Sequence, residues 1–167
     1  MSAIINHLGI TVGDIHAAVA FYTSVFDLAV LVPPQFHSTD TPAAERRRDV
    51  FGPHWGGMKL AHLANDAGMG FELFEFVAPA SQPAQDAFEY WRQGHSHVCL
   101  TVADLDLVLA RLIKAGGKQR SQIHQVNPQT RIVYCEDPWG AVLELSTGTY
   151  HQLTGTAHEH PARNEVK

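Results

Sequence analysis

Two pairs of residues in this sequence have the types and positions needed to bind a metal ion. His7 opens the segment HLGITVGDI and His97 opens HVCLTVADL ninety residues later, with His, Thr, Val and Asp at matching places. Glu72 lies in FELFEF and Glu144 lies in VLELST, so each glutamate follows one of the histidines within a β-prone segment. Imidazole nitrogens and carboxylate oxygens are common ligands of divalent ions. The repeat therefore predicts one divalent ion bound by all four side chains.

The surroundings of the two glutamates strengthen this prediction. Glu72 and Glu144 each lie between two apolar residues of their segments. A carboxylate buried among apolar groups costs several kcal/mol of folding free energy unless a cation or hydrogen-bond donors compensate it. One shared metal ion would compensate both carboxylates. The alternative is that either glutamate faces solvent on a half-exposed sheet.

Three further residues near these candidates receive different interpretations. His95 lies two residues before His97 and would point to the same side of an extended strand, where it is a candidate for contact with substrate or with the metal ligands. Glu75 lies three residues after Glu72 and therefore on the opposite strand face, where we expect a surface carboxylate. His62 has no spacing that relates it to the four candidate ligands.

The segments that follow the two histidines predict matching helices. In residues 15–26 and 105–115, apolar residues recur at spacings of three and four, as they do on one face of an amphipathic helix. Asp14 and Asp104 precede these segments and suit the N-cap position, where a carboxylate accepts from the free amides of the first turn. The predicted fold class is α+β, with two tandem βαβββ modules that form a curved mixed sheet around a metal site.

The length and the repeat together predict a single domain. A chain of 167 residues can bury a core without the support of disulfides. Residues 33–57 are rich in proline, glycine and polar residues, and we expect a long loop there. The predicted organisation of residues 1–167 is module one at 4–77 with an insertion at 33–57, a linker at 78–94, module two at 95–148 and a C-terminal extension at 149–167.

The composition excludes several classes of partner. The formal charge of −5 provides no basic face for nucleic acid or for an anionic membrane surface. Two cysteines are too few for a secreted disulfide scaffold, and no segment has the features of a signal peptide or a membrane span. We therefore expect a cytoplasmic protein that binds neither nucleic acid nor a membrane.

The motifs resemble those of the vicinal oxygen chelate superfamily, which includes glyoxalase I, extradiol dioxygenases and bleomycin-resistance proteins. The resemblance runs from about Ile5 to Ser146 and rests on HLGITVGD, FYTSVFDL, FELFEF, HVCLTVAD and YCEDPWGAVLEL. By position, the four candidate ligands match the His, Glu, His, Glu set of bacterial-type glyoxalase I. Thr11 stands where glyoxalase I commonly has an arginine that binds the carboxylate of glutathione. The resemblance also implies a homodimer in which both subunits contribute to each site.

The resemblance implies a reaction as well as a metal site. It indicates a glyoxalase I-like lyase or isomerase that acts through a metal-bound enediolate on a substrate with two adjacent oxygens. Glu144 is the expected base, with Glu72 as its symmetric partner, and the ion is expected to be Ni, Co, Zn, Fe or Mn. Two alternatives remain open: an Fe(II) or Mn(II) extradiol-type dioxygenase that uses two histidines and one glutamate, and a metal-free protein that binds a drug.

Overall fold

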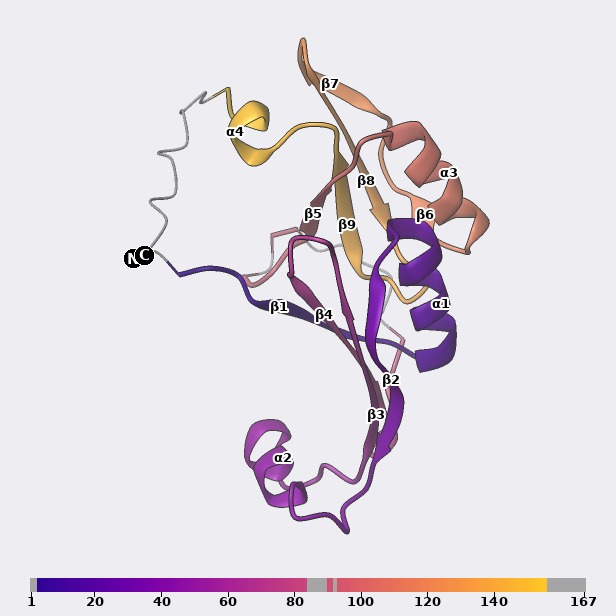
Figure 1. The fold of residues 1–167 in the computed structure, drawn as a ribbon, viewed down its shortest axis with the longest axis vertical. Helices are drawn as coiled ribbons and strands as arrows, with labels where there is room; N and C mark the ends of the chain where they lie inside the picture. The colour runs from indigo at the N-terminus through magenta and orange to yellow at the C-terminus, as the bar shows by residue number, and fades with distance from the viewer. Residues whose placement is uncertain (1–2, 84–89, 92, 156–167) are drawn as a thin grey trace.

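The chain folds as two modules that each begin with one strand and one helix and continue with further strands, and module one has a second helix among these strands (Figure 1). The computed structural model describes residues 3–83, 90–91 and 93–155. Module one contains β1 (His7–Thr11), α1 (Ile15–Phe26), β2 (Ala29–His37), α2 (Ala44–Phe51), β3 (Met58–Ala64) and β4 (Gly70–Phe76). Module two contains β5 (Val98–Thr101), α3 (Leu105–Lys114), β6 (Lys118–Gln119), β7 (His124–Asn127), β8 (Thr130–Glu136) and β9 (Val142–Ser146), and α4 (Tyr150–Leu153) follows it.

The strands form one mixed sheet in each module. The first sheet has the order β1-β4-β3-β2, in which β1 is parallel to β4 and the other pairs are antiparallel. In the second sheet, β5 is parallel to β9, β9 pairs antiparallel with β8, and both β6 and β7 pair with β8. The predicted α+β fold is confirmed. The hydrogen bonds divide its strands between two sheets, where we expected one curved sheet.

The two modules share a core that lies on one side of both sheets. Helices α1 and α3 pack against each other, and they lie next to each other in Figure 1. Their apolar faces join strand residues such as Phe71, Leu73, Leu143 and Leu145 in a single buried cluster. Because strand side chains alternate between faces, Glu72 and Glu144 point away from this core. The shared core thus leaves the candidate ligands on the faces that the two helices do not cover.

The predicted N-caps are present at both helices. Asp14 Oδ1 accepts hydrogen bonds from the amides of His16 and Ala17, and Asp104 Oδ1 accepts one from Leu107. The prediction that Glu75 is a surface carboxylate is wrong. Its Oε2 accepts from the amide of Ile15 at 2.9 Å, and its Oε1 lies 2.7 Å from Lys59 Nζ. Glu75 is on the helix side of β4, where it meets the positive end of α1.

The predicted loop at 33–57 is only partly irregular. Strand β2 continues to His37, and α2 occupies part of the remainder. Ala44 and Phe51, seven residues apart, lie on the same side of α2, which packs on the sheet face opposite α1. The run of charged residues between them hides this narrow apolar face in the sequence. Trp55, just after the helix, is buried in the same small cluster.

Two other predicted segments lie partly outside the described residues. The predicted linker at 78–94 includes residues 84–89 and 92, and the predicted C-terminal extension at 149–167 includes 156–167. The prediction cannot be compared with the structure at residues 84–89, 92 and 156–167. Within the described part of the chain, no helix is long and apolar enough to cross a membrane.

A buried hydrogen bond connects the two modules. The hydroxyl of Tyr22 on α1 donates to Asp137 Oδ2 at 2.7 Å, and Asp137 Oδ1 accepts from the amides of Trp139 and Ala141. Burial raises the pKa of both the Tyr22 phenol and the Asp137 carboxyl. The turn before β9 is thereby attached to the first helix of the other module.

Tyr22→Phe is therefore expected to destabilise the fold. The substitution keeps the ring but removes a donor from a buried acceptor, which should lower the free energy of unfolding by about 1–3 kcal/mol. Urea denaturation followed by circular dichroism measures this change. Tyr150→Phe is the matched control, because that side chain is 77% exposed. Equal midpoints for Tyr22→Phe and the wild type would show that the buried hydrogen bond adds nothing to stability.

Candidate metal centre

His7 and Glu72 form the first candidate ligand pair. Strand β1 runs parallel to β4, with His7 opposite Gly70, and His7 Nε2 lies 3.4 Å from Glu72 Oε2. A Cβ atom on residue 70 would fall 3.0 Å from the Cβ of His7, so glycine allows the close approach. His7 Nδ1 lies 2.8 Å from Asn6 Oδ1. Asn6 Oδ1 can only accept a hydrogen bond, so this contact suits the tautomer with the proton on Nδ1, in which Nε2 would be free to bind an ion.

A second imidazole, which the sequence did not indicate, lies beside the same carboxylate. His62 on β3 is paired with Glu72 in the antiparallel register, and its Nδ1 lies 3.7 Å from Glu72 Oε1. The signal that could have identified it was the hairpin between β3 and β4. Once that turn sets the register, residues 62 and 72 must be directly opposite each other on one face.

His97 and Glu144 form the second candidate pair. His97 directly precedes β5, and its Nε2 lies 3.0 Å from Glu144 Oε2. Ser96 Oγ lies 2.9 Å from His97 Nδ1. The Glu144 side chain is only 6% exposed, compared with 25% for Glu72. A tight turn precedes β9, with Gly140 at φ 90°, a conformation that favours glycine.

Two protonated groups flank Glu144 on the neighbouring strands. Cys99 on β5 and Tyr134 on β8 both lie opposite Glu144 in the sheet register. Burial, and then the Glu144 carboxylate, raises the pKa of the Cys99 thiol to about 12. The same two causes raise the pKa of the Tyr134 phenol, whose oxygen is 3.4 Å from His97 Nε2. Both groups therefore stay protonated near neutral pH and can donate to Glu144.

The structure brings the four predicted ligands together only as two pairs. His7 and Glu72 belong to the first sheet, and His97 and Glu144 belong to the second. Among the described residues of one chain, no group of three or more histidine, cysteine, aspartate or glutamate side chains is arranged to hold a metal ion. His95 is exposed and precedes β5.

The donors in these pairs nonetheless have the chemistry that a divalent ion requires. Two imidazoles and two carboxylates suit a first-row transition metal. In the described residues, the ion pairs of Glu72 and Glu144 are with histidines, and neither carboxylate is paired with a lysine or an arginine. Cys99 and Tyr134 can donate hydrogen bonds to Glu144 but carry no charge, so a cation between the pairs would compensate the buried Glu144 in particular.

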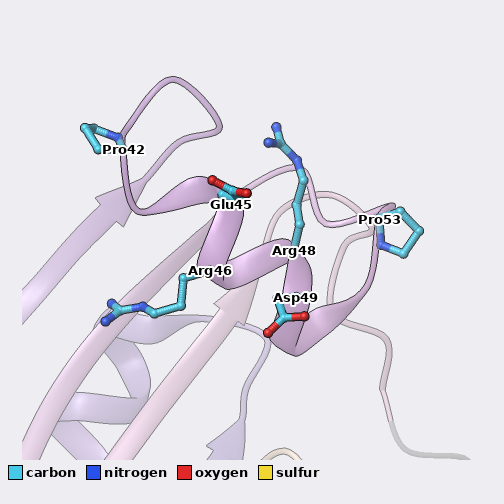
Figure 2. Close-up of a pocket in the computed structure, with 6 residues that line it drawn as sticks. All are labelled: Pro42, Glu45, Arg46, Arg48, Asp49 and Pro53. Carbon is cyan, nitrogen blue, oxygen red and sulfur yellow. The ribbon is translucent and has the colours of Figure 1, made fainter.

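A surface hollow lies elsewhere, over α2 (Figure 2). Its charged side chains point in different directions, with Arg46 and Arg48 directed away from each other. Acidic and basic groups are mixed along this exposed surface and do not converge on one point. We assign no site to it. Its lining residues are Pro42, Glu45, Arg46, Arg48, Asp49 and Pro53.

Comparison with known proteins identifies the family. Residues 4–145 match the model of the Glyoxalase/Bleomycin resistance protein/Dioxygenase superfamily. The chain belongs to this superfamily. The predicted membership of the superfamily is confirmed, whereas a particular likeness to glyoxalase I stays a prediction. Membership of this superfamily does not by itself select one reaction.

Individual members of the superfamily resemble the chain over most of its length. The metallothiol transferase FosB of Shouchella clausii (strain KSM-K16) is 28% identical over 152 residues, which are 87% of this chain and 80% of FosB. A glyoxalase family protein from Bacillus cereus has a TM-score of 0.71 at 21% identity, covering 84% of this chain and 91% of that one. A mutant of the fosfomycin resistance protein FosX from Listeria monocytogenes, complexed with Mn(II) and 1S,2S-dihydroxypropylphosphonic acid, has a TM-score of 0.59 at 16% identity, covering 95% and 99%. The two solved structures indicate a shared fold.

Proposed function

We propose that this protein is a divalent-metal enzyme that acts on a small molecule with two adjacent oxygens, and that two copies of the chain build each metal centre. The observation that carries the proposal is the repeated pairing of one imidazole with one carboxylate, at 3.4 Å in module one and 3.0 Å in module two. Each pair lies on a sheet face that α1 and α3 leave uncovered. In a twofold dimer, module one of one chain and module two of the other would complete a four-ligand centre.

Exposed apolar residues that precede both histidines in the chain support this arrangement. Ile4 and Ile5, just before His7, are 84% and 73% exposed, and Trp91, six residues before His97, is 67% exposed. Large apolar side chains that are exposed next to a candidate site are typical of a surface that a partner covers. A homodimer would bury these residues next to the ligands that it brings together.

The two glutamates are suited to different tasks. Glu144 is buried and flanked by His97, Tyr134 and Cys99, which favours a ligand with a fixed orientation. Glu72 is more exposed and lies beside the imidazoles of His7 and His62, so it has more freedom to move toward a substrate. We therefore assign the base to Glu72 and keep Glu144 as a ligand. The sequence had instead favoured Glu144 as the base, with Glu72 as its symmetric partner. A bound ion would act as a Lewis acid toward the two substrate oxygens.

The proposed reaction class is isomerisation or lyase chemistry that begins with the removal of a proton from carbon. Glu72 would accept this proton, and its two imidazole neighbours would stabilise the orientation of the carboxyl group. Thr11 offers no cation for the glutathione carboxylate, so we propose a different substrate from that of glyoxalase I. The similarity to FosB favours one second candidate, the addition of a thiol to a small phosphonate. That addition needs no carbon base, so substitution of Glu72 separates the two reactions.

Metal binding is the first test of the proposal. Excess Mn(II) should raise the thermal unfolding midpoint, because a ligand at a hundred times its dissociation constant stabilises the folded state by about 2.7 kcal/mol. A chelator should reverse the shift, and His7→Ala/His97→Ala should abolish it. His124→Ala is the matched control, since that histidine is exposed on β7. Metal-free purified protein with no response to Mn(II), Ni(II), Co(II), Zn(II) or Fe(II) would favour the drug-binding alternative, and oxygen consumption with a catechol would favour the dioxygenase.

A further inference from the structure

We infer that the insertion at 33–57 builds a second half of the substrate site, an aromatic wall with an arginine at its far end, which accepts a flat apolar molecule bearing an anionic group. The aromatic wall consists of Phe51, Phe74 and Phe76, and the arginine is Arg47. This inference rests on the proposed function and deepens it by naming the class of substrate. It also gives α2 a role, because this helix carries none of the candidate metal ligands.

The aromatic wall begins immediately beside the candidate base. Phe74 and Phe76 follow Glu72 at steps of two residues on β4, so all three side chains share the face opposite the core. The rings of Phe74 and Phe76 are stacked, with centroids 5.8 Å apart and planes only 9° apart. A Cβ atom on Gly9 would fall 3.1 Å from Phe74 Cε2, so the Phe74 ring lies close to β1. The stacked pair thus continues the face that carries His7 and Glu72.

Helix α2 closes the far end of this face. Phe51 meets both rings edge-on, with centroids 6.0 Å from that of Phe74 and 5.2 Å from that of Phe76. Phe51 is still 41% exposed, although three aromatic rings converge there. In Figure 1, α1 and α2 lie on opposite sides of the ribbon formed by β2 and β3. The helix therefore belongs to the same side of the sheet as the candidate ligands.

Arg47 supplies a positive charge at this end that no carboxylate neutralises among the described contacts. Its guanidinium lies 5.9 Å from the centre of the Trp55 ring, and Nη2 lies 2.9 Å from Nδ1 of His37. Burial, followed by Arg47 and His62, lowers the pKa of His37, so this imidazole is neutral and acts as the acceptor. The indole Nε1 of Trp55 is also buried and has no hydrogen-bond partner in the described part of the chain. Side-chain donors therefore outnumber acceptors in this cluster, which favours an anionic ligand.

The dimensions of the face suit a small organic molecule. Glu72 and Phe76 are four residues apart on a strand, which corresponds to roughly 13 Å. A molecule with its reacting oxygens near Glu72 would lay its rings along Phe74 and Phe76 and present its anionic group to Arg47. Aromatic side chains prefer to pack against flat apolar surfaces, which selects a planar body over a short aliphatic chain. A three-carbon substrate would leave the aromatic wall and Arg47 unused.

Calorimetric titration of the full-length, metal-loaded protein with 2-naphthoate tests the inference. We expect Phe51→Leu and Arg47→Gln each to weaken binding about tenfold, because one removes a ring contact and the other a charged donor. Phe51→Leu keeps an apolar residue under α2, and unchanged circular dichroism establishes that the helix persists. Val50→Ala is the matched control, because Val50 is 67% exposed on the same helix. In the wild type, the neutral 2-naphthalenemethanol should bind about tenfold more weakly than 2-naphthoate, and Arg47→Gln should not change its affinity further.

Three outcomes would overturn the inference. The first is the absence of 2-naphthoate binding, and the second is equal affinity of Phe51→Leu, Arg47→Gln and Val50→Ala for it. The third is loss of binding in His97→Ala with no effect of Arg47→Gln, because that result would place the naphthoate carboxylate on the metal. The metal measurements are independent of these results. Naphthoate binding that depends on Phe51 and Arg47 in a protein that binds no metal would support the aromatic site while refuting the proposed enzyme.

Discussion

Mixing two inactive variants of this protein is expected to restore about a quarter of the wild-type metal sites. One variant carries His7→Ala and Glu72→Gln, and the other carries His97→Ala and Glu144→Gln. Each variant alone has only one intact pair of ligands per centre. The prediction assumes that each centre combines module one of one chain with module two of the other. Random pairing then makes about half of the dimers mixed. Each mixed dimer has one complete centre and one centre with no ligands, so about a quarter of all centres are complete.

The readouts are bound metal per chain and turnover after the variants are refolded together. The matched control mixes the His7→Ala/Glu72→Gln variant with a differently tagged copy of itself, because every chain then lacks the ligands of module one and no dimer has a complete centre. This control mixture should recover nothing. Failure of the first mixture to recover metal, with subunit exchange verified by differently tagged chains, would refute a centre shared between chains. It would be consistent with ligand pairs that act separately within each chain.

Glu72→Gln is expected to reduce turnover by about 10² to 10⁴-fold while the metal stays bound, which is the usual contribution of a general base. Glutamine keeps the shape of the side chain and one oxygen, but it cannot accept a proton from carbon. Glu144→Gln should instead reduce both metal content and turnover, because Glu144 is the buried ligand beside His97. Turnover would be measured with the hemithioacetal of phenylglyoxal, which carries a flat apolar ring, and with fosfomycin plus a thiol, and metal content by elemental analysis.

The comparison of these two variants separates three interpretations. If Glu144→Gln keeps its full metal content but loses turnover, and Glu72→Gln stays active, the general base is Glu144. Retained turnover of fosfomycin in Glu72→Gln would support thiol addition in place of proton removal. Glu75→Gln is the matched control for changes of charge on β4, since Glu75 contacts Ile15 and Lys59 on the other side of the strand. We expect it to affect stability and to leave turnover unchanged.

The local elements were predictable because short-range physics determines them. The helix expected at 15–26 is α1, and the one expected at 105–115 ends one residue earlier, because apolar spacing and aspartate caps act within a few residues. Helix α2 was missed because its apolar contacts are few and are separated by charged residues. Its stability depends on the sheet beneath it, which no sequence window contains.

The roles of individual acidic and basic residues depended on contacts from distant segments. Glu75 was expected to be free in solvent, yet it caps a helix sixty residues away in the chain. His62 had no informative spacing, and only the register of the β3–β4 hairpin places it opposite Glu72. Alternation along a strand predicts the side of a residue, but it does not predict what lies on that side.

By itself, the sequence determined that each module carries one histidine and one glutamate in equivalent strands, because a repeated pattern of strand, helix and turn is encoded locally. Only the tertiary structure decided which of them meet. Parallel pairing of β1 with β4 and of β5 with β9 joins residues that are distant in the chain into the pairs His7–Glu72 and His97–Glu144. The packing of α1 against α3 then buries the core between the modules and leaves the pairs on two separate sheets. The physical reason is that α1 and α3 bury the apolar faces of both sheets. The opposite faces, which carry the candidate ligands, are left uncovered by these helices and can meet a second copy of the chain.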